Sequence, residues 1–295
     1  MSDTLSNIPQ KRRSFPTFAD LVVLVLLFGV GQILGALIVM PFLMSQYGQT
    51  GFGDSPTSQI IIYTASMATS LIAMSIYRRA RGANYRTLRY RLKWFNGSLV
   101  IVGLVAITAI GIIEEPLFAL MPEEWMDFVE QAIGTGKWAI LNTVLIAPVL
   151  EEMIFRGVIL ESVRSRWGKI WAIVVSALLF GVVHGVPQQA INAAMVGVIL
   201  GAIYIATDSL LAVIVLHAIN NALSYVLMIL FPNNNDTLRS MITSDVVYWS
   251  VYAASCVAVI ICGTIIFTAV KRHRTKTVAA PATEGNNTAN QGVNE

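Results

Sequence analysis

Two adjacent glutamates, Glu151 and Glu152, have the clearest chemical potential in this sequence because they lie inside an otherwise apolar stretch. Arg156 follows them, and the stretch reads VLIAPVLEEMIFRGVIL. An ionisable side chain at the centre of a bilayer costs roughly 2.5–3.5 kcal/mol on insertion scales and by default marks a functional site. We therefore expect a functional site inside a membrane.

Further polar side chains, His184, His217 and Asn221, interrupt later apolar stretches. His217 and Asn221 are four residues apart and share a helix face, as do Phe180 and His184. Together with a carboxylate, two imidazoles and an amide can activate water and donate hydrogen bonds to a developing oxyanion. This combination indicates a hydrolase site.

Helical spacing separates the two glutamates into different roles. Glu152 and Arg156 are four residues apart, so they can pair along one helix. Glu151 points about 100° away from Glu152, toward the face of Phe155, and has no cation on its own helix. We expect Glu151 to meet a partner from another helix, and Glu152 and Arg156 to be supporting residues.

The composition is that of an integral membrane protein. Of the 295 residues, 55% are hydrophobic and 13% are charged, whereas about a quarter are charged in soluble domains. We predict an all-α polytopic membrane protein with about eight transmembrane helices and a buried polar site among spans four to seven. The predicted spans are Phe18–Leu43, Gln59–Tyr77, Ser98–Met121, Trp138–Val163, Ile170–Gly185, Gln188–Ala206, Leu210–Phe231 and Val246–Val270.

The basic residues predict the orientation. All but three of the 20 lysines and arginines fall on one side of these spans, in the groups 11–13, 78–93, 164–169 and 271–276. Basic loops stay on the cytoplasmic side, so both termini are expected there, in a multi-pass protein of a bacterial cell membrane. The opposite side is acidic, notably Met121–Glu130.

Two other charged segments admit simpler interpretations. Glu114 and Glu115, near the end of the third span, have no arginine at the matching spacing, and we expect them to be interfacial. The basic segment Arg78–Lys93, followed by Trp94, either lies on the anionic inner leaflet or is an ordinary cytoplasmic loop.

The predicted organisation has five parts. Residues 1–17 form a cytoplasmic N-terminal segment, and 18–137 hold the first transmembrane helices with a basic cytoplasmic loop at 78–97. Residues 138–231 form the core with the polar site, and 232–270 an outer loop and the last span. Residues 271–295 are a basic flank and a tail whose polar composition predicts disorder.

Three motifs in order connect these residues to a known family. Glu151 to Arg156 fits EExxxR, Phe180 to His184 fits FxxxH, and His217 to Asn221 fits HxxxN. Over roughly Trp138–Phe231 the chain resembles the CAAX protease and bacteriocin-processing family (CPBP, or Abi) of intramembrane proteases, which includes the type II CAAX prenyl endopeptidases. Each motif alone is weak, but three in order on successive spans are a strong signal.

The resemblance implies roles for these residues. Glu151 and His184 would activate water, and His217 and Asn221 would stabilise the oxyanion. Glu152, Arg156 and Phe180 would support them. If a metal such as zinc is bound, Glu151, His184 and His217 would be its ligands.

The resulting hypothesis is an intramembrane endopeptidase acting on a membrane-associated or secreted peptide. Its expected partners are a peptide or protein substrate and the lipid bilayer, with no nucleic acid. The sequence lacks HExxH, GxSxG and paired aspartates within the spans, which excludes the protease types that depend on them. A proton-coupled transporter and a non-catalytic bacteriocin-immunity protein stay open as alternatives.

Overall fold

The computed structural model of the chain describes residues 15–51, 55–83, 89–122, 124–125, 133–231 and 238–278, without the side chains of 49–51 and 273–278. Four parts of the predicted organisation therefore lie outside the described residues: the N-terminal segment before residue 15, residues 84–88 of the basic loop, most of the acidic loop at 126–132, and the tail after residue 278. Within the described ranges all regular secondary structure is helical.

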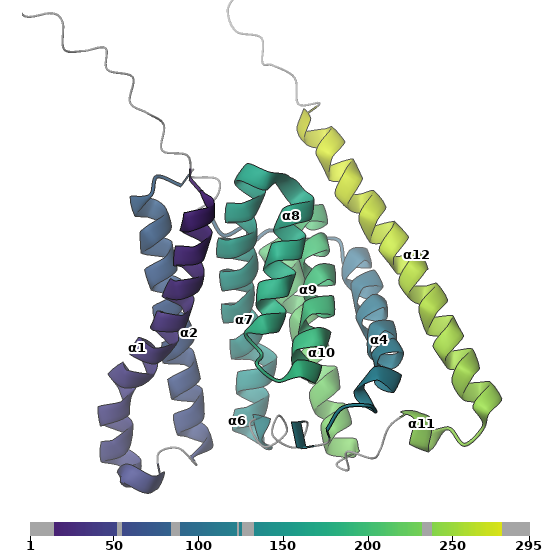
Figure 1. The fold of residues 1–295 in the computed structure, drawn as a ribbon, viewed down its shortest axis with the longest axis horizontal. Helices are drawn as coiled ribbons and strands as arrows, with labels where there is room; N and C mark the ends of the chain where they lie inside the picture. The colour runs from purple at the N-terminus through teal and green to yellow at the C-terminus, as the bar shows by residue number, and fades with distance from the viewer. Residues whose placement is uncertain are drawn as a thin grey trace, which may run out of the picture.

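Long apolar helices make up most of the chain (Figure 1). Six helices in the described part are long and apolar enough to cross a membrane, which confirms an all-α polytopic membrane protein. They are α1 (Phe18–Gly51), α2 (Pro56–Ala80), α4 (Ser98–Phe118), α9 (Pro187–Thr207), α10 (Leu210–Leu230) and α12 (Asp245–Val278). A short helix, α11 (Leu238–Met241), precedes α12.

The fourth and fifth predicted spans fall on one helical path that changes its winding several times. Its parts are α6 (Lys137–Ile140), the π-helix η1 (Leu141–Ile146), α7 (Ala147–Glu152), the π-helix η2 (Met153–Leu160) and α8 (Glu161–Val182). Gly168, with φ 85°, bends the path within α8. The chain rises through α7 and returns through α8 (Figure 1), so this path runs once up and once down beside the six long apolar helices, and the count of eight spans stays a prediction.

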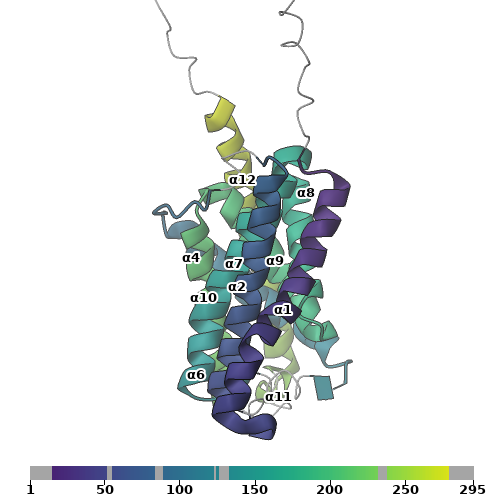
Figure 2. The ribbon, with the colours of Figure 1, turned by 90° about the vertical axis from the view of Figure 1, so that its left-hand side faces the viewer.

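Small residues bring α1 and α2 into close contact, and α1 packs mainly on α2 (Figure 2). A Cβ added to Gly31 would lie 2.5 Å from Ser70 Cα, and one added to Gly35 would lie 2.4 Å from Ser66 Cα. The Gln32 amide donates to Ser70 Oγ at 3.0 Å, and Ser66 Oγ donates to the Gln32 carbonyl at 2.8 Å. Close backbone approach with added hydrogen bonds is a common way to join helices in a membrane.

The start of α1, the end of α2, the bend in α8 and the end of α12 lie at one end of the bundle (Figure 1). Asp208, whose backbone is in the left-handed region with φ 54°, lies at this end and forms ion pairs with basic side chains. It pairs with Arg91, with Lys93 at 2.8 Å and with Arg164 at 3.7 Å. The described part of the basic segment therefore packs on the turn between α9 and α10, although Trp94 beside it is exposed.

Replacing Gly35 by leucine should lower the midpoint of thermal unfolding in detergent. The new side chain would force the backbones of α1 and α2 apart, and such overpacking costs roughly 1–3 kcal/mol. Gly29→Leu is the matched control, because a Cβ at Gly29 meets nothing within 4 Å. Equal midpoints for the two variants would contradict the close packing.

Candidate active site

The paired glutamates sit at the end of α7, between the two π-helices. In η1 the Ala147 N–H donates to the carbonyl of Asn142, five residues earlier. The next donor in this register would be the N–H of Pro148, which proline lacks. The carbonyl of Thr143 is thus left over, and Asn221 on α10 donates to it from Nδ2 at 2.9 Å.

The second π-helix also uses side chains from other helices. Ser176 Oγ on α8 donates to the carbonyl of Phe155 at 2.9 Å, and Arg78 Nη1 on α2 donates to the carbonyl of Gly157 at 3.0 Å. π-Helical turns are rare and are frequent at functional sites. Here they fix α2, α8 and α10 against the helix that carries the glutamates.

Glu152 is the centre of a buried charged group. Its Oε1 accepts from Arg156 Nη1 at 2.8 Å and contacts His217 Nδ1 at 2.9 Å, and neither the Glu152 nor the Arg156 side chain is exposed. Arg156 also donates to the carbonyl of Gly197 at 3.2 Å and lies over the Phe180 ring, with Cζ 4.7 Å from its centroid. The pair with Arg156 is the one expected from spacing, whereas the contact with His217 was not predicted.

Glu151 finds its partners on other helices. Tyr63 on α2 donates its hydroxyl to Glu151 Oε1 at 2.7 Å. His217 Nε2 lies 3.7 Å from Glu151 Oε2, which is too long for a direct hydrogen bond but close enough for a shared water or substrate atom. Sequence reasoning missed Tyr63, since its only signal is a phenol within an apolar span that carries no motif.

The two histidines are held through Nδ1. A carbonyl can only accept, so the 2.7 Å contact of His184 Nδ1 with the Phe180 carbonyl places a proton on Nδ1. In the neutral ring Nε2 then carries the lone pair. His217 uses Nδ1 toward Glu152 in the same way. The Phe180 ring makes edge-to-face contacts with both imidazoles, and its centroid lies 4.8 Å from that of His184 and 5.7 Å from that of His217.

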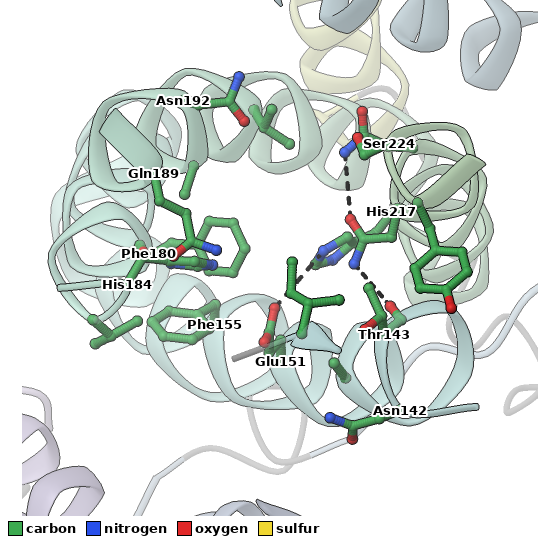
Figure 3. A pocket seen from close by; sticks show the side chains of 18 of the residues that line it. Asn142, Thr143, Glu151, Phe155, Phe180, His184, Gln189, Asn192, His217 and Ser224 are labelled. Atoms are coloured by element: carbon green, nitrogen blue, oxygen red, sulfur yellow. Dashed lines mark hydrogen bonds and ion pairs between the residues drawn. The ribbon is translucent and has the colours of Figure 1, made fainter. Parts of the chain in front are cut away.

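A cavity of about 600 Å³ joins these groups. Glu151, His184, His217 and Asn221 all line it. Figure 3 shows the first three together with Phe155 and Phe180, which contribute apolar surface. The four residues proposed from sequence are thus brought to one cavity, although they do not all touch. Of the two described histidines there, only His217 comes within 4.0 Å of the Glu151 carboxylate.

Part of the chain that contains this site is similar to a known protein family. Residues 134–223 match the family described as "Type II CAAX prenyl endopeptidase Rce1-like". This match supports placing the chain in the CAAX protease family. The matched segment contains both π-helices and every motif residue from Glu151 to Asn221, whereas Tyr63 lies outside it.

One curated relative is an uncharacterized 24.3 kDa protein of Escherichia coli, which is 30% identical over 125 residues. The alignment covers 40% of this chain and 58% of that protein, so the chain spans little more than half of the relative's length. No solved structure matches the chain.

The predicted zinc ligands do not form a ligand set in this structure. Among the residues that the structure describes, no group of three or more His, Cys, Asp and Glu side chains is arranged to hold a metal ion. Ligand atoms about 2.0–2.2 Å from zinc lie at most about 4 Å from one another. Glu151 and His217 meet this condition, but Glu151 and His184 do not.

Glu114 lies beside the cavity, and its side chain faces the interior of the bundle. The residue is 5% exposed, and its Oε2 accepts from Asn192 Nδ2 at 2.8 Å. Its neighbour Glu115 instead accepts from the backbone N–H of Arg239 at 2.9 Å, at the end of the bundle opposite Asp208. Adjacent helical residues point about 100° apart, so one glutamate can face the bundle while the next faces the boundary.

Arg156→Met should strongly destabilise the fold. Breaking a buried ion pair leaves an uncompensated charge, here on Glu152, and costs roughly 3–5 kcal/mol. The measurement is thermal unfolding of the purified protein in detergent. Arg79→Met is the matched control because Arg79 is exposed at the end of α2. An unfolding midpoint for Arg156→Met equal to that of the control would rule out the buried pair.

Proposed function

We propose that this protein is an intramembrane endopeptidase that hydrolyses a peptide bond of a membrane-associated or secreted peptide. The observation that carries the proposal is the Glu151 carboxylate, held by Tyr63 in a cavity that also contains His184, His217 and Asn221. The family match covers Glu151, His184, His217 and Asn221, though not Tyr63, and supports the same reaction class.

Glu151 would act as the general base. It takes a proton from a water molecule while the water oxygen attacks the carbonyl carbon of the scissile bond. The proton then passes to the departing amine nitrogen as the carbon–nitrogen bond breaks, so the step balances without a covalent enzyme intermediate. His184 would orient the same water through the Nε2 lone pair, because its Nδ1 is committed to the Phe180 carbonyl.

His217 and Asn221 would stabilise the oxyanion. His217 stands between two carboxylates, Glu151 and Glu152, and would donate to the oxyanion from Nε2, the ring nitrogen on the Glu151 side. Asn221 uses one amide hydrogen for the Thr143 carbonyl and retains a second for a substrate oxygen. Preorganised donors of this kind are worth most where water is excluded.

The membrane setting defines the class of partner. We infer a substrate presented at the lipid bilayer, since the site lies among membrane-spanning helices. We also infer that the end of the bundle with Arg91, Lys93 and Arg164 faces the cytoplasm of a bacterial cell, because positive charge is retained on that side.

Glu151→Gln should abolish proteolysis, and His184→Ala should reduce it at least ~100-fold, a typical contribution of a positioned acid or base. The measurement compares new N-termini in membrane and secreted fractions of cells expressing each variant. Glu115→Gln is the matched control, because Glu115 lies at the end of the bundle and contacts Arg239.

Identical sets of new N-termini in wild type and Glu151→Gln cells would sink the proposed function. Loss of the same N-termini in the Glu115→Gln control would show that the effect comes from folding. The amount of each protein in the membrane is therefore measured in parallel.

Tyr63→Phe removes one hydroxyl and should lower kcat. A hydrogen bond to a charged group is worth about 1.5–3 kcal/mol, so we expect a decrease of roughly 10- to 100-fold with KM little changed. The substrate is a quenched peptide copied from a Glu151-dependent cleavage site. Tyr47→Phe, at an exposed phenol of α1, is the control. A wild-type kcat in Tyr63→Phe would remove Tyr63 from the mechanism.

A further inference from the structure

The wall of the cavity opposite Glu151 is built by α9 and is polar. Gln189 and Asn192 line it, and Figure 3 places Asn192 across the open space from Glu151. The amide nitrogen of Asn192 turns away from the space, and its oxygen turns toward it (Figure 3). The cavity therefore presents a hydrogen-bond acceptor on this side.

Glu114 fixes this orientation of the amide. A carboxylate can only accept hydrogen bonds, so the 2.8 Å contact with Glu114 Oε2 holds the Asn192 nitrogen and leaves Oδ1 for the cavity. Glu114 comes from α4, outside the family match, and is 5% exposed. Its other oxygen, Oε1, has no hydrogen-bond partner among the described residues. A buried carboxyl group is costly, and the hydrogen bond described for its side chain is to Asn192, a cavity residue.

An extended peptide needs such an acceptor. Its carbonyl groups and N–H groups point to both edges of the strand, and each unsatisfied group costs free energy in a site shielded from water. In the proposed mechanism, His217 and Asn221 donate hydrogen bonds to the scissile carbonyl on the side of the cavity where Glu151 lies. The opposite edge of the same peptide then requires acceptors for its N–H groups.

We propose that Asn192 Oδ1 forms a substrate-binding subsite that accepts a hydrogen bond from a main-chain N–H of the peptide, and that Glu114 is the residue that positions the Asn192 amide. This inference rests on the proposed endopeptidase function. It names a recognition element that reads the peptide backbone and is indifferent to side-chain identity.

The test uses the full-length protein in lipid nanodiscs. The probe is a quenched fluorescent peptide that copies the residues around the strongest Glu151-dependent new N-terminus. Asn192→Leu removes the acceptor and should raise KM roughly tenfold, the effect of one lost hydrogen bond, with kcat within about twofold of wild type. Asn192→Asp replaces the amide donor to Glu114 by a second carboxylate, so the two groups repel and the side chain loses its orientation. This variant should also raise KM.

A reciprocal swap provides the rescue. In Glu114→Gln/Asn192→Asp the new amide donates to the new carboxylate, and an acceptor again faces the cavity. We expect KM to return to within about threefold of wild type. A purely structural role would change the unfolding midpoint and the amount of active protein without changing KM, so both are measured. Asn96→Leu, at an exposed loop amide, is the control.

The outcomes separate the two proposals. An unchanged KM in Asn192→Leu, with Glu151→Gln inactive, overturns the subsite and leaves the endopeptidase function standing. Failure of the swap to lower the KM of Asn192→Asp overturns the positioning role of Glu114. If no new N-terminus depends on Glu151, the proposed function and this subsite fall together.

Discussion

The carboxylate of Glu152 is the group on which the site depends. It has no exposed surface, yet it contacts Arg156 on its own helix and His217 on α10. Arg156 extends the link to the Gly197 carbonyl on α9. One buried carboxylate therefore connects the helix of the glutamates with α10 directly and with α9 through Arg156. Such a group is costly in a membrane, and its cost is offset only while every partner stays in place.

The π-helical turns complement this charged centre. Side chains of neighbouring helices donate to backbone carbonyls of both, Asn221 to Thr143 in η1 and Ser176 and Arg78 to Phe155 and Gly157 in η2. The helix of the glutamates is thus held at both ends by neighbouring helices through its backbone. Glu151 needs that rigidity, because its own contacts are few: Tyr63 and, at a longer distance, His217.

The predictable features were those with a local cause. Apolar length and basic flanks predicted the spans, and helical spacing predicted that Glu152 pairs with Arg156 while Glu151 looks elsewhere. The missed features depend on packing between distant segments. The sequence around Tyr63 does not indicate its contact with Glu151, 88 residues later. The sequence around Glu114 likewise does not indicate its contact with Asn192, 78 residues later. The π-helices were also missed, because the side chains that donate to their carbonyls come from α2, α8 and α10, and hydrophobic periodicity does not mark them.

Pro148 has a consequence for how this helix can vary. A proline removes one backbone donor whatever the winding, so one carbonyl before it must stay free. In an α-helical register that carbonyl would belong to Val144, four residues earlier; in the observed π register it belongs to Thr143. The proline therefore always leaves one carbonyl without a backbone donor, and the helical register determines which carbonyl that is. In the π register the Thr143 carbonyl accepts from Asn221. In an α register the free carbonyl would lie about 100° further around the helix, and a different neighbour would have to satisfy it.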